Sequence, residues 1–291
     1  MVSPAIAIAA LFTLTPFLAA AFFARDLQRA AEALPVRVRL FASIILCVPY
    51  VLVACSTGTF RWGWLALYAL LPVVVSTLMW QARHVDAARH GNWRDYLVLA
   101  ILGLAVDLRW FERAWPPHLA VFNKMLLLDA GIYGLLVLRQ LDGVGFDLRL
   151  RLHDVRVGLR EAIFYTPIAI ALGLSIGFLH LHAAWPRLLQ FAGAFVFTFF
   201  FIAVPEELFF RGWLQNLLER RMGRYPALLL TAALFGLSHF NKRALHFNWR
   251  YVLLAAVAGI FYGRAWRQER RVRASAITHA TVDTIWSFWL R

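Results

Sequence analysis

Long apolar runs recur along this chain from one end to the other. Several are roughly 15–22 residues long, and a helix that crosses a bilayer needs about 20. Because 61% of the residues are hydrophobic, against about 45–50% in soluble domains, the composition favours a membrane protein. Runs of this length then predict an all-α fold. The expected architecture is a polytopic transmembrane helix bundle of about eight to ten membrane helices. The predicted membrane segments are 4–23, 40–56, 62–80, 96–106, 120–138, 161–182, 187–205, 225–240, 250–266 and 274–290.

The positive charge of the chain lies between these runs. The net charge is +14, and arginines cluster within 25–39, 83–94, 220–224 and 264–273. Such clusters are typical of loops that face an anionic cytoplasmic leaflet, so we expect the lipid bilayer as a partner. No long polar segment shows a basic face with interleaved aromatic residues, so nucleic acid is not expected as a partner. The arginine- and alanine-rich composition is typical of a bacterial chain and favours an integral, multi-pass protein of the bacterial cytoplasmic (inner) membrane.

One segment breaks the helical pattern and suggests a domain boundary. Between residues 146 and 153 apolar and polar residues alternate, which is the period of a half-buried strand. The segment near 146–157 is therefore predicted as a short strand, a hairpin or an extended stretch at the membrane surface, and it could also guide a substrate. We expect N-terminal transmembrane helices in 1–140, an interfacial linker in 141–160 and a C-terminal core in 161–291.

Two adjacent carboxylates, Glu206 and Glu207, follow the apolar run 187–205. Charges in such a place are costly unless they pair or face a wet cavity. Arg211 follows Glu207 at the i,i+4 spacing of a helical ion pair, whereas Glu206 points about 100° away and must find its partners on other helices. A buried carboxylate without a local cation is suited to act as a general base. Alternatively, the pair simply begins a cytoplasmic helix after Pro205, where acids favour the positive helix end.

Two further apolar runs carry imidazoles. His239 lies near the end of the run 225–240, four residues after Phe235, so the two share a helical face. His279 and Asp283 are also four residues apart, within the last run. Ionisable residues in three separate membrane segments predict a functional site in which they are one another's partners.

These three motifs, in this order, resemble the CAAX-processing and bacteriocin-immunity (CPBP) family of intramembrane proteases, which includes the type II CAAX prenyl endopeptidases. That family carries EExxxR, FxxxH and HxxxN-like motifs on successive membrane helices, and the resemblance covers roughly residues 160–290. One position departs from the pattern, because Asp stands here where the prenyl endopeptidases usually have Asn. The matching positions are Glu206, Glu207, Arg211, Phe235, His239, His279 and Asp283.

The resemblance implies hydrolysis of a peptide bond by water inside the membrane. It gives Glu206 the role of the base that activates water, with His239 helping to hold that water. His279 and Asp283 would polarise the scissile carbonyl or orient the water. An ionised Asp283 cannot donate to an oxyanion as Asn does, so it would orient His279 or remain protonated. The supporting residues would be Glu207, Arg211 and Phe235.

The sequence leaves two ways to activate the water. The favoured one needs no cofactor, since Glu206 acts alone as in a glutamate-type protease. Alternatively, Glu206, His239 and His279 would ligate zinc or another divalent metal, as in a metalloprotease. No HExxH motif is present, which excludes a zincin helix.

The first functional hypothesis is an intramembrane endopeptidase that cuts near a membrane anchor, such as a bacterial protein-sorting or processing protease. Its partner would be a membrane-anchored or C-terminal-helix protein substrate. One alternative is a non-catalytic membrane immunity or binding protein of the same fold. Another is a proton-coupled transporter that uses the buried Glu and His residues as a relay. Transporters often show paired repeats, whereas the ionisable cluster is confined here to the C-terminal part.

Overall fold

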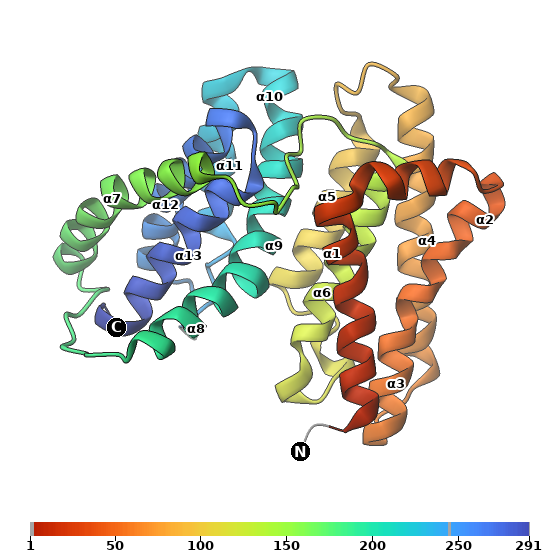
Figure 1. The fold of residues 1–291 in the computed structure, drawn as a ribbon, viewed down its shortest axis with the longest axis horizontal. Helices are drawn as coiled ribbons and strands as arrows, with labels where there is room; N and C mark the ends of the chain where they lie inside the picture. The colour runs from red at the N-terminus through yellow and green to blue at the C-terminus, as the bar shows by residue number, and fades with distance from the viewer. Residues whose placement is uncertain (1–2, 244–245, 291) are drawn as a thin grey trace. The chain divides into compact units, whose positions relative to one another are not determined.

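The computed structural model describes residues 3–243 and 246–290, and the regular elements within these ranges are all helical, with no strand. The chain divides into two compact units, Met1–Asp142 and Gly143–Arg291, called here the N-terminal and the C-terminal unit. Each unit is a bundle of helices (Figure 1). The predicted all-α class is therefore confirmed.

Long apolar helices build both units. The N-terminal unit contains α1 (Pro4–Glu32), α2 (Val36–Phe41), α3 (Val48–Thr57), α4 (Trp62–Val85), α5 (Trp93–Asp107) and α6 (Val121–Gly131). The C-terminal unit contains α7 (Leu152–Ser175), α8 (Leu188–Thr198), α9 (Val204–Glu207), α10 (Asn216–Met222), α11 (Arg224–Leu237), α12 (Trp249–Glu269) and α13 (Val272–Trp289).

Within the described residues, six helical stretches are long and apolar enough to cross a membrane. They are Pro4–Glu32, Val36–Thr57, Trp62–Val85, Pro117–Leu138, Leu152–Ser175 and Leu188–Met222. This number is below the expected range of about eight to ten, because some predicted segments form helices shorter than the about 20 residues that a span requires. For example, α5 has 15 residues and α11 has 14.

A buried ion-pair network closes one end of the N-terminal unit. Arg139 is 0% exposed, and its guanidinium binds Asp95 Oδ1 at 2.8 Å and Asp86 Oδ2 at 2.5 Å. Asp95 also accepts the backbone N–H of Asn92, the N-cap of α5, at 2.8 Å. A fully buried cation is tolerated when it is paired and hydrogen-bonded in this way, so the network fixes the start of α5 against the end of the α6 segment.

The period-two stretch before α7 is extended but pairs with no strand among the described residues. Val144, Phe146 and Leu148 are buried at every second position, as the alternation predicts. The Val272 N–H donates to the Gly145 carbonyl at 3.0 Å, which fixes the stretch to the turn between α12 and α13. The extended-stretch interpretation therefore describes the first half of the segment.

For the second half of 146–157 the prediction was wrong, because α7 begins at Leu152 and residues 152–157 are helical. Val157, Glu161 and Tyr165 are buried at a spacing of four, so one helical face packs into the unit from this point. The alternation continues to His153 and so overlaps the first residues of α7, and a strand or hairpin over 146–157 was wrong.

The helical span Leu188–Met222 carries the two glutamates near its middle, in α9. Pro205 lies inside this span, so the alternative in which the glutamates begin a new cytoplasmic helix was wrong. A π-helical segment lies on each side of α9, and the one before it accommodates the N–H that proline lacks. Single π-turns of this kind are common at functional sites. The two segments are Phe199–Ala203 and Leu208–Gln215.

Helices α11 and α12 pack with their backbones in close approach. A Cβ atom on Gly236 would lie 2.5 Å from the Val252 carbonyl oxygen, and one on Gly259 would lie 2.9 Å from the Ala232 Cα. Small residues permit such approach between membrane helices. The close packing brings the end of α11, which carries His239, beside the first turns of α12.

Candidate active site

Glu207 is the buried member of the glutamate pair. It is 0% exposed, and its carboxylate lies 3.2 Å from Arg211 Nε and 2.9 Å from His279 Nδ1. The Ser275 hydroxyl also donates to it. Arg211 is its i,i+4 neighbour on the helix, while Ser275 and His279 come from one face of α13. Glu207 thus ties the glutamate helix to α13, and its charge is satisfied from three sides.

The Arg211 guanidinium is fully buried behind Glu207. Nη2 donates to the Gly259 carbonyl of α12 at 3.0 Å. The guanidinium carbon lies 4.7 Å from the ring centroid of Phe235 and 5.5 Å from that of Tyr262. These cation–π contacts add to the ion pair and hold the cation in place. Phe235 therefore packs beneath the charged groups.

The His279 imidazole lies between carboxylates on both sides. Nδ1 donates to Glu207 Oε1, and Nε2 lies 3.5 Å from Asp283 Oδ2 and 3.9 Å from Glu206 Oε2. The ring stacks on Tyr262 with centroids 4.6 Å apart and an interplanar angle of 16°. The position of the ring is therefore fixed by the stacked face and both nitrogens, with Nε2 directed to the more open side of the site.

Glu206 is the accessible member of the pair, with 29% of its side chain exposed. Besides His279, it contacts Lys242, whose Nζ lies 3.9 Å from Glu206 Oε1. Lys242 belongs to the loop between α11 and α12. Glu206 therefore lies between an imidazole from α13 and an ammonium from this loop, and it has the access to solvent or substrate that Glu207 lacks.

His239 follows the C-terminal end of α11, where the last carbonyls of a helix lack helical partners. One of these is the Phe235 carbonyl, and His239 Nδ1 lies 2.9 Å from it. Because a carbonyl only accepts, Nδ1 carries the hydrogen and Nε2 is left as an acceptor. The ring packs against Phe235 and Tyr251, with centroids 5.0 and 4.7 Å away. The four-residue spacing of Phe235 and His239 thus sets the tautomer.

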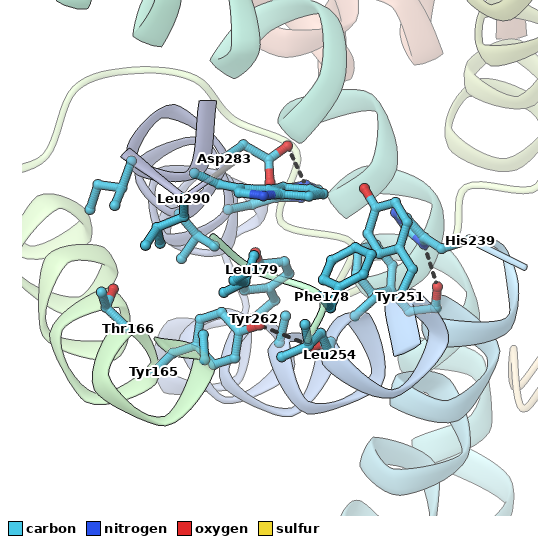
Figure 2. A pocket seen from close by; sticks show the side chains of 18 residues that line it. Tyr165, Thr166, Phe178, Leu179, His239, Tyr251, Leu254, Tyr262, Asp283 and Leu290 are labelled. Carbon is cyan, nitrogen blue, oxygen red and sulfur yellow. Dashed lines mark hydrogen bonds and ion pairs between the residues drawn. The ribbon is translucent and has the colours of Figure 1, made fainter. Parts of the chain in front are cut away.

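A cavity of about 60 Å³ joins the two histidines. His239, His279 and Asp283 line it together with aromatic residues of α7, α12 and α13, and apolar side chains such as Leu179 and Leu254 line it further from the carboxylates. Figure 2 shows His239 and Asp283 on its wall with Tyr251 and Leu179. A buried water needs about 10–15 Å³ of such volume, so the cavity has room for several water molecules.

The donor set for a metal is not assembled in this arrangement. Within residues 3–243 and 246–290, no group of three or more His, Cys, Asp and Glu side chains has the geometry to hold a metal ion. His279 Nδ1 is occupied by Glu207, so only Nε2 of this ring is left for a ligand. As they stand, Glu206, His239 and His279 are therefore not gathered into a zinc site.

Three site contacts were missed from the sequence. Ser275 lies four residues before His279, so the spacing argument that joined His279 to Asp283 could have found it. Tyr262 stacks on His279 but carries no distinguishing signal in the sequence. Lys242 was treated as a loop cation, although it is one of only two lysines among 30 Lys and Arg residues.

Comparison with known proteins bears on the C-terminal unit. Residues 188–285 match the family model described as type II CAAX prenyl endopeptidase Rce1-like. No curated protein and no solved structure gave a significant match. The matched range holds all the motif residues from Glu206 to Asp283 and confirms the resemblance to the CAAX protease family. Together with the apolar spans, it supports an integral, multi-pass membrane protein with a domain similar to that of the intramembrane CAAX endopeptidases.

Proposed function

We propose that this Rce1-like domain hydrolyses a peptide bond of a membrane-anchored protein with water that Glu206 activates. The observation that carries the proposal is the position of His279 at the cavity, with Nδ1 held by Glu207 and Nε2 directed toward Glu206 and Asp283. His239 lines the same cavity from a different helix. A base, two imidazoles and room for water are the parts that such a hydrolysis needs.

In the proposed reaction the Glu206 carboxylate takes a proton from a water molecule, and the water oxygen attacks the carbonyl carbon of the scissile bond. His239 accepts a hydrogen bond from this water at Nε2, since its Nδ1–H is committed to the Phe235 carbonyl. The proton held by Glu206 then passes to the leaving nitrogen as the C–N bond breaks. A positioned base of this kind contributes about 10²–10⁴-fold to the rate.

His279 and Asp283 act on the opposite side of Glu206 in this proposal. The Nε2–H of a doubly protonated His279 polarises the scissile carbonyl or orients the water, and Asp283 fixes the direction of that N–H at 3.5 Å. Glu207 and Arg211 do not touch the reactants. Their buried pair prevents rotation of His279 and neutralises one carboxylate charge next to the base.

The apolar end of the cavity favours an apolar side chain of the substrate beside the scissile bond. The helical spans support a substrate in or at the bilayer, which is where a membrane-anchored segment would be delivered. We further propose, from the arginine- and alanine-rich composition, that the protein acts in a bacterial cytoplasmic membrane on sorted or processed proteins with a C-terminal apolar helix. The prenylated CAAX peptide of the family name is the competing substrate.

The test is cleavage by the full-length protein reconstituted in liposomes. Two fluorescence-quenched probes are offered, a farnesylated CAAX peptide and a peptide that ends in an apolar transmembrane helix. Glu206→Gln removes the base, and we expect a loss of about 10²–10⁴-fold. His239→Ala should also abolish most activity. The matched control is Glu269→Gln, which removes an exposed carboxylate that pairs with His153 at 3.4 Å, and it should retain the wild-type rate.

Cleavage of the helix-terminated probe supports the processing role, and cleavage of the farnesylated peptide alone replaces it with the prenyl-peptide role. If Glu206→Gln and His239→Ala both retain full activity, the reaction does not occur at this site. If the wild-type protein cleaves neither probe, the non-catalytic binding or immunity function of the same fold is favoured instead.

A further inference from the structure

Lys242 lies on the loop between α11 and α12, three residues after His239, and its backbone is fixed on both sides. The Lys242 N–H donates to the His239 carbonyl at 3.2 Å, and the Lys242 carbonyl accepts from Asn248 Nδ2 at 3.0 Å. Asn248 is fixed in turn, because its Oδ1 caps α12 by accepting the Tyr251 N–H at 3.2 Å. Lys242 is thus tied to a proposed catalytic histidine and to the start of α12.

The next residue holds the same loop against the cavity wall. The Arg243 guanidinium carbon lies 4.2 Å from the ring centroid of Trp286, which lines the cavity. A cation over the face of a tryptophan is attracted by the ring quadrupole, so the contact orients the loop. The two consecutive cations therefore have different partners, and only the first of this pair is directed to a carboxylate of the site.

The Lys242 ammonium lies close to Glu206 but beyond hydrogen-bonding distance of it. Its Nζ lies 3.9 Å from Glu206 Oε1, whereas N–H···O bonds measure about 2.7–3.2 Å. The side chain is 34% exposed, so its charge is open to the space beside Glu206. An ammonium is a compact charge with three donors on a flexible stem, which suits it to follow an oxygen whose charge changes during a reaction.

The chemistry at this site favours a second positive charge in that space, in addition to the His279 N–H. Attack on a peptide carbonyl places a negative charge on its oxygen, beside the carboxylates of Glu206, Glu207 and Asp283. Ionised carboxylates only accept hydrogen bonds and would repel this charge. Arg211 does not reach it, since the guanidinium is 0% exposed and binds Glu207 and the Gly259 carbonyl. The Lys242 ammonium lies beside Glu206, the proposed base, on the side of this carboxylate that is accessible.

We propose that Lys242 is a further catalytic residue, whose ammonium pairs with the oxyanion formed when water attacks the scissile carbonyl; this rests on the proposed hydrolysis. As the water oxygen bonds to the carbonyl carbon, the C=O pair moves to oxygen and Glu206 receives the water proton. When the C=O bond re-forms, the C–N bond breaks and that proton goes to the nitrogen. Lys242 keeps its protons throughout and contributes charge alone.

The test compares Lys242→Gln and Lys242→Arg in the liposome cleavage assay with whichever of the two probes the wild-type protein cleaves. Removal of one oxyanion donor costs about 10²–10³-fold in kcat, and we expect Lys242→Gln to show this loss. Because the contact forms only in the transition state, kcat and kcat/KM should fall together. Lys242→Arg should restore part of the rate. The matched control is Arg250→Gln, an exposed cation of α12 near the same loop, which should leave kcat unchanged.

The pH profile separates this role from an indirect one. If Lys242 acted only by keeping Glu206 ionised, raising the pH would restore the rate of Lys242→Gln, and that result would overturn the proposal. A wild-type kcat in Lys242→Gln, or a change in KM alone, would overturn it as well. In all three cases the loss in Glu206→Gln would still stand, so hydrolysis at this site would survive. If the wild-type protein cleaves neither probe, both the proposed hydrolysis and this inference are refuted.

Discussion

The buried pair of Glu207 and Arg211 makes the protein sensitive to the loss of either charge. Arg211→Met keeps the volume of the side chain but removes the cation beside a carboxylate that is 0% exposed. Breaking a buried ion pair by removing one partner costs about 3–5 kcal/mol, since the other charge stays buried without compensation. The cation–π contact with Phe235, at 4.7 Å, and the hydrogen bond to the Gly259 carbonyl are also lost.

We therefore expect Arg211→Met to lower the free energy of unfolding by at least about 3 kcal/mol, against a total of about 5–15 kcal/mol for a typical domain. Glu207→Gln should cost less, because the amide oxygen can still accept from one of the two donors, His279 or Ser275. The double variant carries no buried charge of this pair, so it should be more stable than Arg211→Met alone. The expected coupling between the two positions is about 1–3 kcal/mol.

The assay is unfolding in mixed detergent micelles, followed by the fluorescence of the 12 tryptophans. All four proteins are measured, namely the wild type, each single variant and the double variant. Two results would refute the reasoning. One is a loss below about 1 kcal/mol in Arg211→Met, the value of an exposed pair. The other is strict additivity, which would show that the two charges do not stabilise each other.

Two further substitutions test the structure away from the glutamate pair. Asp129 is 1% exposed in the N-terminal unit, and among the described residues neither of its carboxylate oxygens has a hydrogen-bond partner. Asp129→Asn should therefore change the unfolding free energy by less than about 1 kcal/mol, and a large loss would reveal a contact. Gly145 has φ +71° and a Cβ there would lie 1.7 Å from the Arg270 carbonyl oxygen, whereas Gly58 has φ +69° with open space around it. Gly58→Ala should cost about 1–2 kcal/mol from its backbone alone, and Gly145→Ala should cost clearly more by the same unfolding assay.

Interactions that depend on spacing along one helix were accessible from the sequence. Glu207 and Arg211 are four residues apart and pair at 3.2 Å, and His279 and Asp283 are four apart and lie 3.5 Å from each other. The helical period alone brings such side chains together, whatever the rest of the fold does. The same holds for His239, whose ring bonds the carbonyl of the residue four positions before it.

Contacts between helices were not accessible in the same way. Helical spacing predicted a single local partner for Glu207, yet the structure adds Ser275 and His279, which are 68 and 72 residues away along the chain. Which face of α13 turns toward the glutamates depends on how α12 and α13 pack, and no short-range pattern encodes that. Lys242 was missed for the same reason, because a loop cation has no period that indicates where its ammonium lies.

The predicted helix boundaries were wrong where two sequence patterns overlapped or where packing overrode a local signal. The alternation up to His153 predicted an extended linker, but the burial of Val157 and Glu161 at helical spacing starts α7 before the alternation ends. Pro205 suggested a helix start, but π-turns on both sides keep the span Leu188–Met222 continuous. Intrinsic helix propensity predicts where a helix ends only weakly, because tertiary packing can supply the missing stabilisation.

The hydrogen bonds of His279 explain how Asp283 can take the place of an amide. Nδ1 and Nε2 both face carboxylate oxygens, at 2.9 Å from Glu207 and 3.5 Å from Asp283. Ionised carboxylates only accept, so a neutral imidazole with one N–H can satisfy only one of them. Either His279 carries both protons or one of the two carboxylates carries one. With both protons on the ring, Asp283 orients an N–H beside Glu206 and cannot itself bind an oxyanion. The motifs then supply only the His279 N–H for that charge, and the ammonium of Lys242, 3.9 Å from Glu206, stands where a second donor can act.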